Sequence, residues 1–510
     1  MRRAIIAVLL VVMAPLGQPV ASGGSRELPL GMAGLPESST SERLARGVTY
    51  TRIERGYRSN VDYYTVDVEV TESLQRAEQV ATDLHAKGYD ARIATVARAQ
   101  DDPRPEPAAY VVRSGRFETQ PAADQRTTEL QSQGYDGART VYSAQTGEPT
   151  TGPFVVHVLK VNPDRYEGTI VPELATEIVP EREKLTDMAR RNDAFAGINA
   201  GYFVIGEQDG TPGDLAGISA IGGRLISEAV NGRTSFLLRP EGDRADVAAL
   251  ATHIEARVGG RRFLADGFNR DPGEIRSCGG VGGDTPTERP KHDFTCADGS
   301  ELIVFTEAFG ANSAAGPGAE VAVDHRGRVV EVRPARGGVI PPGGLVLSAT
   351  GDTASQLLET QPGERARVSA TVTERRKKVS LSKGLGIVNG GPRLLRGGRP
   401  DITAYREGFV WLEDPAFWYR FGAFRHPRTM AGLTNAGKIL LVAIDGRHFD
   451  HSVGASFKEE AGVMRALGAV EAVNLDGGGS TTLVIDGELV NRPSDTTGER
   501  PIGDALLLFD

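Results

Sequence analysis

Two stretches near the start of the chain share one pattern of apolar and polar residues. Strand-like runs at 64–70 and 109–114 are each followed by an amphipathic helical stretch and then by another strand-like run. The helical stretches stop at Gly88 and Gly134, and glycine tolerates the left-handed conformation that often ends a helix. Two β-α-β units of this size can bury one face of each helix against a shared sheet.

The chain from 153 to 510 shows no break in composition long enough to end a domain. Its first apolar run, 154–159, reads as a strand. Helical spacing over 180–191 leads into a short apolar run at 194–198, which stops at Asn199.

The same order of elements returns near the C-terminus. A capping box at 456–459 predicts the start of a helix, and the apolar run 469–475 that follows it stops at Asp476. Polar residues at strand ends with glycine-rich exits are typical of ligand sites in α/β proteins. We therefore expect Asn199 and Asp476 to contribute to one site.

The pattern predicts an α+β protein. A small β-α-β-β-α-β domain over 61–145 precedes a larger domain over 153–510 that is built on a mixed sheet. Residues 23–60 are rich in Ser, Gly, Pro and charge, and we interpret them as a linker.

An apolar run at 4–16 follows two arginines and precedes small residues, which is the pattern of a secretory signal peptide over 1–22. The run is too short to span a membrane comfortably, and no other long apolar run occurs, so no stable membrane span is expected. We expect a secreted or envelope-associated protein, in which Cys278 and Cys296 form a disulfide that fixes a loop.

Composition excludes several classes of protein. The chain has 510 residues and a net charge of −9, which argues against a general nucleic-acid binder. With 63 glycines and 29 prolines, it suits short strands and turns better than an all-α fold. Two cysteines are too few for cysteine-rich zinc or iron–sulfur sites.

Residues 432–438 have the spacing of a phosphate-binding Walker loop, but Ile439 stands where a hydroxyl should hold magnesium. The apolar run 439–444 reads as a buried strand. We therefore interpret 435–437 as a hairpin turn and exclude an NTPase.

His448 and His451 lie near Asp445 and Asp450, but they lack a recognisable metal-ligand pattern. A solvated loop is the preferred interpretation, and a metal requirement stays open. The absence of a Gly-x-Ser-x-Gly elbow argues against a serine hydrolase of that type.

Three consecutive glycines, Gly477, Gly478 and Gly479, follow Asp476. They exceed the need of a tight turn and cost backbone entropy, so they favour a nest of backbone N–H groups that binds an anion. A loose hairpin is the alternative. Arg428 offers a planar fork that suits phosphate oxygens, although a surface ion pair would also explain it.

The paired strand–helix–Gly-Tyr–strand layout over 61–144 resembles the SPOR family, whose modules bind peptidoglycan glycan strands that lack stem peptides. The resemblance implies peptidoglycan as a partner. A repeat that serves only spacing or dimerisation is the alternative.

The larger domain resembles the phosphodiester glycosidase family. The stretches that carry the resemblance are Asn199-Ala200-Gly201-Tyr202-Phe203, Gly267-Phe268-Asn269-Arg270, Asn389-Gly390-Gly391-Pro392, His426-Pro427-Arg428-Thr429, Asp445-Gly446-Arg447, Asn474-Leu475-Asp476-Gly477-Gly478-Gly479-Ser480 and Glu499-Arg500. Two departures are Ala200, where the family often has glycine, and the long insertion around the cysteines.

The resemblance implies hydrolysis of a sugar-1-phosphodiester without a cofactor. The bond that breaks joins the anomeric carbon of the sugar to a phosphodiester oxygen. A phosphate leaving group needs charge neutralisation more than protonation. We expect Asp476 to act as nucleophile or base, with Asp445 as the second carboxylate, and Arg428 to clamp phosphate. The predicted substrate-binding residues are Asn199, Tyr202, Asn389, His426, Arg447, Gly477, Gly478, Gly479 and Ser480.

Two other functions fit the same residues. A non-catalytic glycan-binding or exopolysaccharide-assembly protein would recognise the same glycan without cutting it. A metal-dependent phosphodiesterase would cleave the P–O bond instead of the C–O bond.

Overall fold

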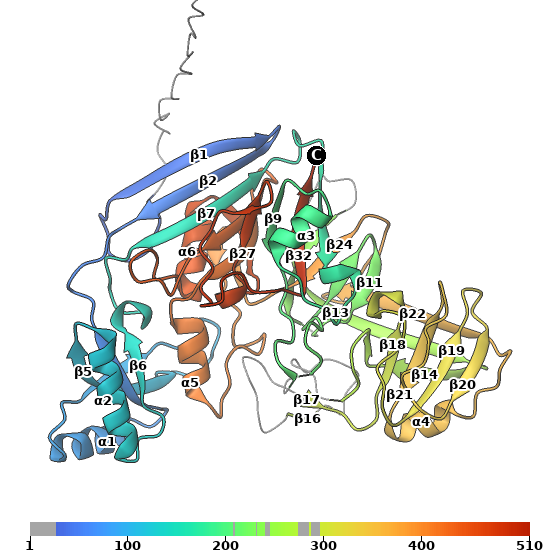
Figure 1. Cartoon of the computed structure of the whole chain (residues 1–510), viewed down its shortest axis with the longest axis horizontal. Coiled ribbons are helices and arrows are strands. Elements are labelled where there is room, and N and C mark those ends of the chain that lie inside the picture. Colours follow the sequence, from blue (N-terminus) through green and yellow to red (C-terminus); the bar gives the residue numbers. More distant parts are fainter. Residues whose placement is uncertain (1–26, 208–209, 231, 240–244, 274–284, 287–295) are drawn as a thin grey trace, which may run out of the picture.

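The computed structural model describes residues 27–207, 210–230, 232–239, 245–273, 285–286 and 296–510 (Figure 1). The predicted signal peptide and Cys278 lie outside these residues, so the signal peptide and the disulfide stay predictions. The other cysteine, Cys296, is buried.

The small N-terminal domain is an antiparallel sheet in the order β4-β5-β3-β6 with two helices on one face. Its elements are β3 (Tyr64–Thr71), α1 (Leu74–Ala86), β4 (Arg92–Val96), β5 (Ala109–Phe117), α2 (Gln120–Ser132) and β6 (Arg139–Tyr142). Val80, Leu84 and Leu130 of the helices pack on the sheet. Gly88 and Gly134 follow the helices with positive φ, as the sequence predicts.

The larger domain is built around an eight-stranded sheet in the order β1-β2-β7-β28-β27-β29-β25-β26. Its strands are β1 (Glu37–Ala45), β2 (Val48–Arg55), β7 (Phe154–Val161), β25 (Arg393–Arg396), β26 (Arg399–Pro400), β27 (Arg428–Thr434), β28 (Ile439–Ile444) and β29 (Ala469–Asn474). Every neighbouring pair is antiparallel.

The first two strands of this sheet overturn the linker predicted at 23–60. β1 and β2 pair with each other, and β2 pairs with β7 along its whole length. β1 is almost entirely exposed and polar, so no apolar alternation marks it as a strand. Backbone hydrogen bonding to a neighbouring strand holds such an edge in place.

A second sheet packs face to face on the first. Its order is β31-β30-β9-β32-β8, from β8 (Thr169–Leu174), β9 (Ala196–Asn199), β30 (Leu483–Ile485), β31 (Glu488–Leu489) and β32 (Asp504–Phe509). Along β27, Ala431 faces this second sheet, whereas Met430 faces α6 (Phe457–Ala466). α3 (Leu185–Arg191) covers the outer face of the second sheet. The layers are therefore α6, the two sheets and α3 (Figure 1).

Two further sheets extend from this core (Figure 1). One sheet has the order β11-β10-β24-β12-β13-β22-β23, with β14 beside β13, and the other has the order β15-β18-β21-β19-β20. The first of them packs on the central sheets through β12, β13 and β24, whose Phe236, Val247 and Val388 share an apolar cluster with those sheets. Their elements are β10 (Ser219–Ile221), β11 (Arg224–Ser227), β12 (Thr234–Leu238), β13 (Ala245–Val258), β14 (Arg261–Ala265), β15 (Gly267–Phe268), β18 (Leu302–Phe305), β19 (Ala319–Val323), β20 (Val329–Arg333), β21 (Leu345–Ala349), α4 (Gly351–Leu357), β22 (Ala366–Glu374), β23 (Lys377–Val379) and β24 (Gly386–Asn389). The β15–β18 pair is parallel and its neighbours are antiparallel, so the α+β prediction with a mixed sheet is confirmed.

Candidate active site

Strand ends from the two packed sheets meet around Asp476. The backbone N–H of Asp476 donates to the carbonyl oxygen of Ala200 at 2.9 Å. In return, Asn199 Nδ2 donates to the backbone oxygen of Asp476 at 2.6 Å. These bonds fasten the loop after β29 to the end of β9, so the two polar strand ends that the sequence singled out do lie together.

The three glycines after Asp476 pass close to other groups. Gly478 adopts φ +62°, and its N–H donates to the carbonyl oxygen of Pro427 at 2.8 Å. A Cβ at Gly477 would lie 2.9 Å from that same oxygen, and a Cβ at Gly479 would lie 2.1 Å from Arg500 Nη2. Glycine is therefore required here because backbone and a guanidinium crowd the loop.

Arg447 lies against this loop. A Cβ added at Gly478 would lie 3.3 Å from the Nη2 atom of Arg447. Its Nε and Nη2 approach His426 Nδ1 at 3.3 and 3.2 Å. His426 Nε2 lies 2.5 Å from the carbonyl oxygen of Arg420, so Nε2 carries the proton and Nδ1 accepts from Arg447. His426 thus orients the Arg447 guanidinium.

No carboxylate lies within ion-pair distance of Arg447 in the described part of the chain. Burial of its charge, together with the positive charges of Arg500 and Arg428, lowers the pKa of Arg447 to about 10. Part of the residue still reaches solvent, and its guanidinium remains cationic at neutral pH. An anion bound beside it would offset the repulsion between these cations.

Arg500 is the second guanidinium at the loop. It forms a two-pronged ion pair with Asp495 through Nε at 2.7 Å and Nη2 at 3.0 Å. The pair fixes the plane of the guanidinium beside Gly479. Arg500 belongs to one of the stretches that carry the family resemblance, but it is not among the predicted site residues.

Arg428 points away from the loop. Its backbone lies beside Gly477, but Nε donates to the Ala455 carbonyl at 2.9 Å and forms an ion pair with Glu460 at 2.9 Å. The guanidinium lies 4.4 Å from the ring centroid of Phe457, and the residue is only 2% exposed. This placement contradicts the predicted phosphate clamp, because a strand sequence does not say which way a long side chain turns.

Asp445 is also engaged by the protein itself. Its Oδ2 accepts from His157 Nε2 at 3.2 Å and from His451 Nε2 at 2.7 Å, and its Oδ1 accepts from Asn491 Nδ2 at 3.1 Å and from the Arg492 N–H at 3.0 Å. Burial opposes ionisation, but the hydrogen bonds from the two histidines outweigh it and hold the pKa of Asp445 well below its ordinary value.

The structure therefore gives Asp445 a framework role in place of the predicted second carboxylate. It also changes the interpretation of the nearby histidines as a solvated loop: His451 binds Asp445, and His448 Nε2 contacts the Pro493 carbonyl at 2.9 Å. Within the described residues, no group of three or more His, Cys, Asp or Glu side chains could hold a metal ion.

Asp504, which the sequence analysis missed, supplies a second carboxyl group near Asp476. It begins β32 and is 1% exposed. Its Oδ1 accepts from the Gly201 N–H at 2.7 Å, whereas its Oδ2 is buried without a hydrogen-bond partner among the described residues. Burial, reinforced by the negative charge of Asp476, raises the pKa of Asp504 to about 7. An acid just before the apolar run 505–509 is a weak signal in sequence.

The raised pKa of Asp504 makes stability depend on pH. The folded protein holds this proton more tightly than the unfolded chain, so the stability that Asp504 contributes is full below about pH 4 and is lost as the pH rises through about 7. We expect Asp504→Asn to remove this dependence, so that wild type loses about 2–4 kcal/mol relative to the variant between pH 4 and 8. Urea unfolding of both proteins across that range measures the difference; a constant difference would contradict the raised pKa.

Three predicted sugar-binding side chains form internal hydrogen bonds instead. Asn199 Oδ1 accepts from Thr429 Oγ1 at 2.8 Å. Asn389 Oδ1 accepts from the Tyr202 N–H at 2.8 Å, and the Tyr202 hydroxyl donates to the Gly391 carbonyl at 2.8 Å. All three side chains are buried. These hydrogen bonds fix the backbone around Asp476.

Unpartnered polar atoms gather at the same strand ends. Asn474 Oδ1 and Ser480 Oγ are buried and, like Asp504 Oδ2, have no hydrogen-bond partner within the described residues. Buried polar atoms are nearly always paired in native proteins, and exceptions often mark functional sites. They add to the case that the surroundings of Asp476 are a site.

Comparison with known families agrees with this geometry. A profile described as phosphodiester glycosidase matches residues 317–509, and a SPOR domain profile matches residues 60–140. The first of these matches contains Asp476, Arg447 and Arg500. Residues 317–509 therefore form a phosphodiester glycosidase domain, and residues 60–140 form a SPOR domain.

Two curated relatives of the chain are N-acetylglucosamine-1-phosphodiester alpha-N-acetylglucosaminidases. The Mus musculus enzyme is 40% identical over 68 residues, which are 13% of this chain and 13% of that enzyme. The Bos taurus enzyme is 38% identical over 83 residues, which are 16% of this chain and 15% of that enzyme. The matched segments thus span only a small part of the curated relatives.

Two solved structures resemble the chain along nearly its whole length. A candidate exported protein of Burkholderia pseudomallei K96243 is 33% identical, with a TM-score of 0.86 over 97% of this chain and 100% of that one. A hypothetical protein from Synechocystis is 18% identical, with a TM-score of 0.55 over 95% of this chain and 81% of that one, and it shows the fold alone.

The SPOR domain is docked on the larger domain by the sheet face opposite its helices. Arg113 of β5 donates to the Tyr419 hydroxyl at 2.6 Å, and that hydroxyl donates to Asp67 Oδ2 at 2.9 Å. Trp418 Nε1 donates to the Ala97 carbonyl at 2.9 Å. Trp418 ends α5 (Pro415–Trp418), so the contacts join β3, β4 and β5 to the glycosidase domain.

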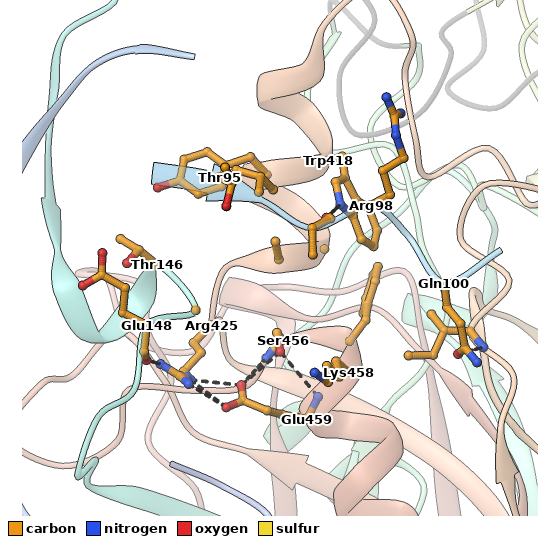
Figure 2. Close-up of a pocket in the computed structure, with 18 of the residues that line it drawn as sticks. Thr95, Arg98, Gln100, Thr146, Glu148, Trp418, Arg425, Ser456, Lys458 and Glu459 are labelled. Carbon is orange, nitrogen blue, oxygen red and sulfur yellow. Dashed lines mark hydrogen bonds and ion pairs between the residues drawn. The ribbon is translucent and has the colours of Figure 1, made fainter. Parts of the chain in front are cut away.

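A cavity of about 810 Å³ lies between the two domains (Figure 2). Thr95 and Arg98 line it from the SPOR side. Arg425, which is ion-paired with Glu459 at 2.7 Å, lines it from the glycosidase side. None of Asp476, Arg447 or Arg500 lines this cavity, so it is separate from the candidate active site.

Proposed function

We propose that the protein hydrolyses a sugar-1-phosphodiester by cleaving the bond between the anomeric carbon of the sugar and the phosphodiester oxygen. We further propose that its substrate is a cell-envelope glycan. One observation carries the proposal: Asp476 shares its loop with glycines that two guanidinium groups, those of Arg447 and Arg500, flank from outside. This arrangement suits a substrate in which a sugar carbon is joined to a phosphate, because the carboxylate can act at the carbon and the two cations can bind the phosphate.

The two guanidinium groups would bind and neutralise the phosphate as it departs. Because the donors are already fixed by His426 and Asp495, little reorganisation accompanies the reaction. A phosphate leaving group needs little protonation, so a single ionised carboxylate, Asp476, suffices as nucleophile or base. Asp504 retains its proton up to about pH 7 and so spares the site a second negative charge.

Arg447→Met tests the phosphate-binding part of this mechanism. We expect kcat/KM for a sugar-1-phosphomethyl ester to fall about 10²–10³-fold, because one fixed cation is lost at the developing charge. The side chain is exposed and has no acidic partner among the described residues, so the free energy of unfolding should change by less than about 1 kcal/mol. Arg447→Lys keeps the charge and should retain part of the activity. Wild-type activity in Arg447→Met would remove Arg447 from the site.

The bond that breaks can be identified in isotopically labelled water. Attack at carbon places the label on the released sugar, whereas attack at phosphorus places it on the phosphate. Label on the phosphate would overturn the proposal in favour of a phosphodiesterase. Binding of the ester with no release of free sugar would instead support a glycan-binding protein.

The SPOR domain supports peptidoglycan as a partner and the cell envelope as the location. The described part of the chain contains no helix with the length and apolarity to cross a membrane. We propose that 61–145 binds glycan strands and that 153–510, together with the two strands at 37–55, performs the hydrolysis. Retention of the full-length protein on purified peptidoglycan is the direct test, and its free passage would exclude that partner.

A further inference from the structure

A cleft of about 380 Å³ at one end of the main sheet is lined by five cationic side chains and by no acidic one. The five are Arg43, Arg46, Lys160, Arg165 and Lys438. Such a concentration of positive charge stands out on a chain whose net charge is −9.

Strand register brings these cations together from distant parts of the sequence. Thr49 of β2 lies opposite Arg43 on one side and opposite Lys160 of β7 on the other. Leu440 of β28 is the next partner of Lys160, which places the hairpin residue Lys438 at the same end of the sheet. The segments 43–49 and 160–165, which lie outside the matched profile at 317–509, thus supply most of the cleft.

The turn between β1 and β2 is packed tightly against the chain that follows β7. The Asn162 N–H donates to the carbonyl oxygen of Gly47 at 2.8 Å. Gly47 has φ +88°, and a Cβ there would lie 2.7 Å from the backbone nitrogen of Tyr166. This contact holds Arg46 and Arg165 on adjoining loops, so the cleft is a fixed part of the fold.

The cations are largely unneutralised by the protein. Arg46 forms an ion pair with Glu167, and both side chains are well exposed. The other four cations form no ion pair within the described residues.

Burial and the charge of Lys438 lower the pKa of Lys160. Asn162 Oδ1 is buried without a partner among the described residues. Like charges held together in this way repel unless an anion binds between them.

The cleft and the candidate active site lie at opposite ends of the same strands. β28 runs from Ile439, beside Lys438, to Ile444, which Arg447 follows closely. Six residues of strand span about 20 Å, so one extended polymer could contact both ends.

We propose that this cleft binds phosphate groups of an extended phosphodiester-linked polymer whose end is cleaved at Asp476, an inference that rests on the proposed function. The cations would hold a phosphate-bearing stretch of the chain about 20 Å from the bond that breaks. A short diester would reach only the active site.

Binding of poly(glycerol phosphate) to the full-length protein, measured by calorimetry at several salt concentrations, tests the inference. We expect the double variant Arg165→Gln/Lys438→Gln to bind at least about tenfold more weakly, with a shallower salt dependence, because two phosphate contacts are lost. Lys377→Gln/Lys378→Gln, an equal charge change on the exposed strand β23, should bind like wild type. Both double variants should hydrolyse a short sugar-1-phosphomethyl ester at the wild-type rate.

Unchanged affinity in the Arg165/Lys438 variant would overturn the inference. So would tighter binding of the wild type, through the same two side chains, to phosphatidylglycerol vesicles or duplex DNA than to poly(glycerol phosphate). The polymer could also bind through Arg165 and Lys438 while no sugar phosphodiester is hydrolysed. That result would overturn the proposed function but support the cleft as a polymer site.

Discussion

Asp476→Asn is expected to lower kcat for a sugar-1-phosphodiester by about 10³-fold or more, because an amide is neither a nucleophile nor a base. The fold should persist. Asp476 is joined to β9 by its backbone groups, and its Oδ1 accepts from the Gly477 N–H at 3.0 Å, which an asparagine oxygen can also do. Release of free sugar and urea unfolding are the two measurements.

Asp486→Asn is a matched control, since Asp486 lies exposed in the turn between β30 and β31. It should leave both turnover and unfolding unchanged. If Asp476→Asn retained a tenth of the wild-type rate, Asp476 would not be the reacting group, and Asp504 would be the next carboxyl group to examine.

At pH 9, where Glu460 is ionised, Arg428→Met is expected to destabilise the protein by about 3–5 kcal/mol, the usual range for removing one partner of a buried ion pair. The change leaves Glu460, which is fully buried, without its cation, and removes the hydrogen bonds that Arg428 donates to the Ala455 and Phe421 carbonyls. The midpoint of urea unfolding measures the effect. Arg447→Met, which removes an exposed guanidinium, is the comparison.

The effect of Arg428→Met should grow as the pH rises. Burial raises the pKa of Glu460 to about 8 even beside Arg428, and loss of the cation raises it further. A folded-state pKa above the unfolded-state value gives stability that is lost as the pH rises, so the deficit of the variant should be larger at pH 9 than at pH 6. Adding Glu460→Gln should remove that pH dependence. Wild-type stability in Arg428→Met would contradict the buried pair.

The sequence predicted elements whose signals are local. The capping box at Ser456 and Glu459 begins α6 as expected, and the hairpin at 435–437 joins β27 to β28. Each depends on side chains within a few residues, or on an apolar run that only a buried strand explains. The two polar strand ends, Asn199 and Asp476, were also placed together correctly.

The sequence failed where the outcome depends on distant partners. The polar strand β1 exists because β2 offers it backbone hydrogen bonds, and nothing in its own composition says so. Arg428 lies beside the glycine loop as predicted, but α6 supplies Glu460 on its other side and turns the guanidinium away. Asp504 acquires its raised pKa from burial and from Asp476, a neighbour 28 positions earlier in the chain.

Hydrogen bonds among Arg113, Asp67 and Tyr419 dock the SPOR sheet directly on the larger domain, so the two domains are not merely joined by a tether. A flexible tether raises the local concentration of every substrate within its reach, whereas a rigid spacing rewards only targets of matching geometry. A molecule anchored through its SPOR domain would therefore cleave only bonds at a fixed distance and direction from the anchoring point. It would leave other bonds of the same strand uncut.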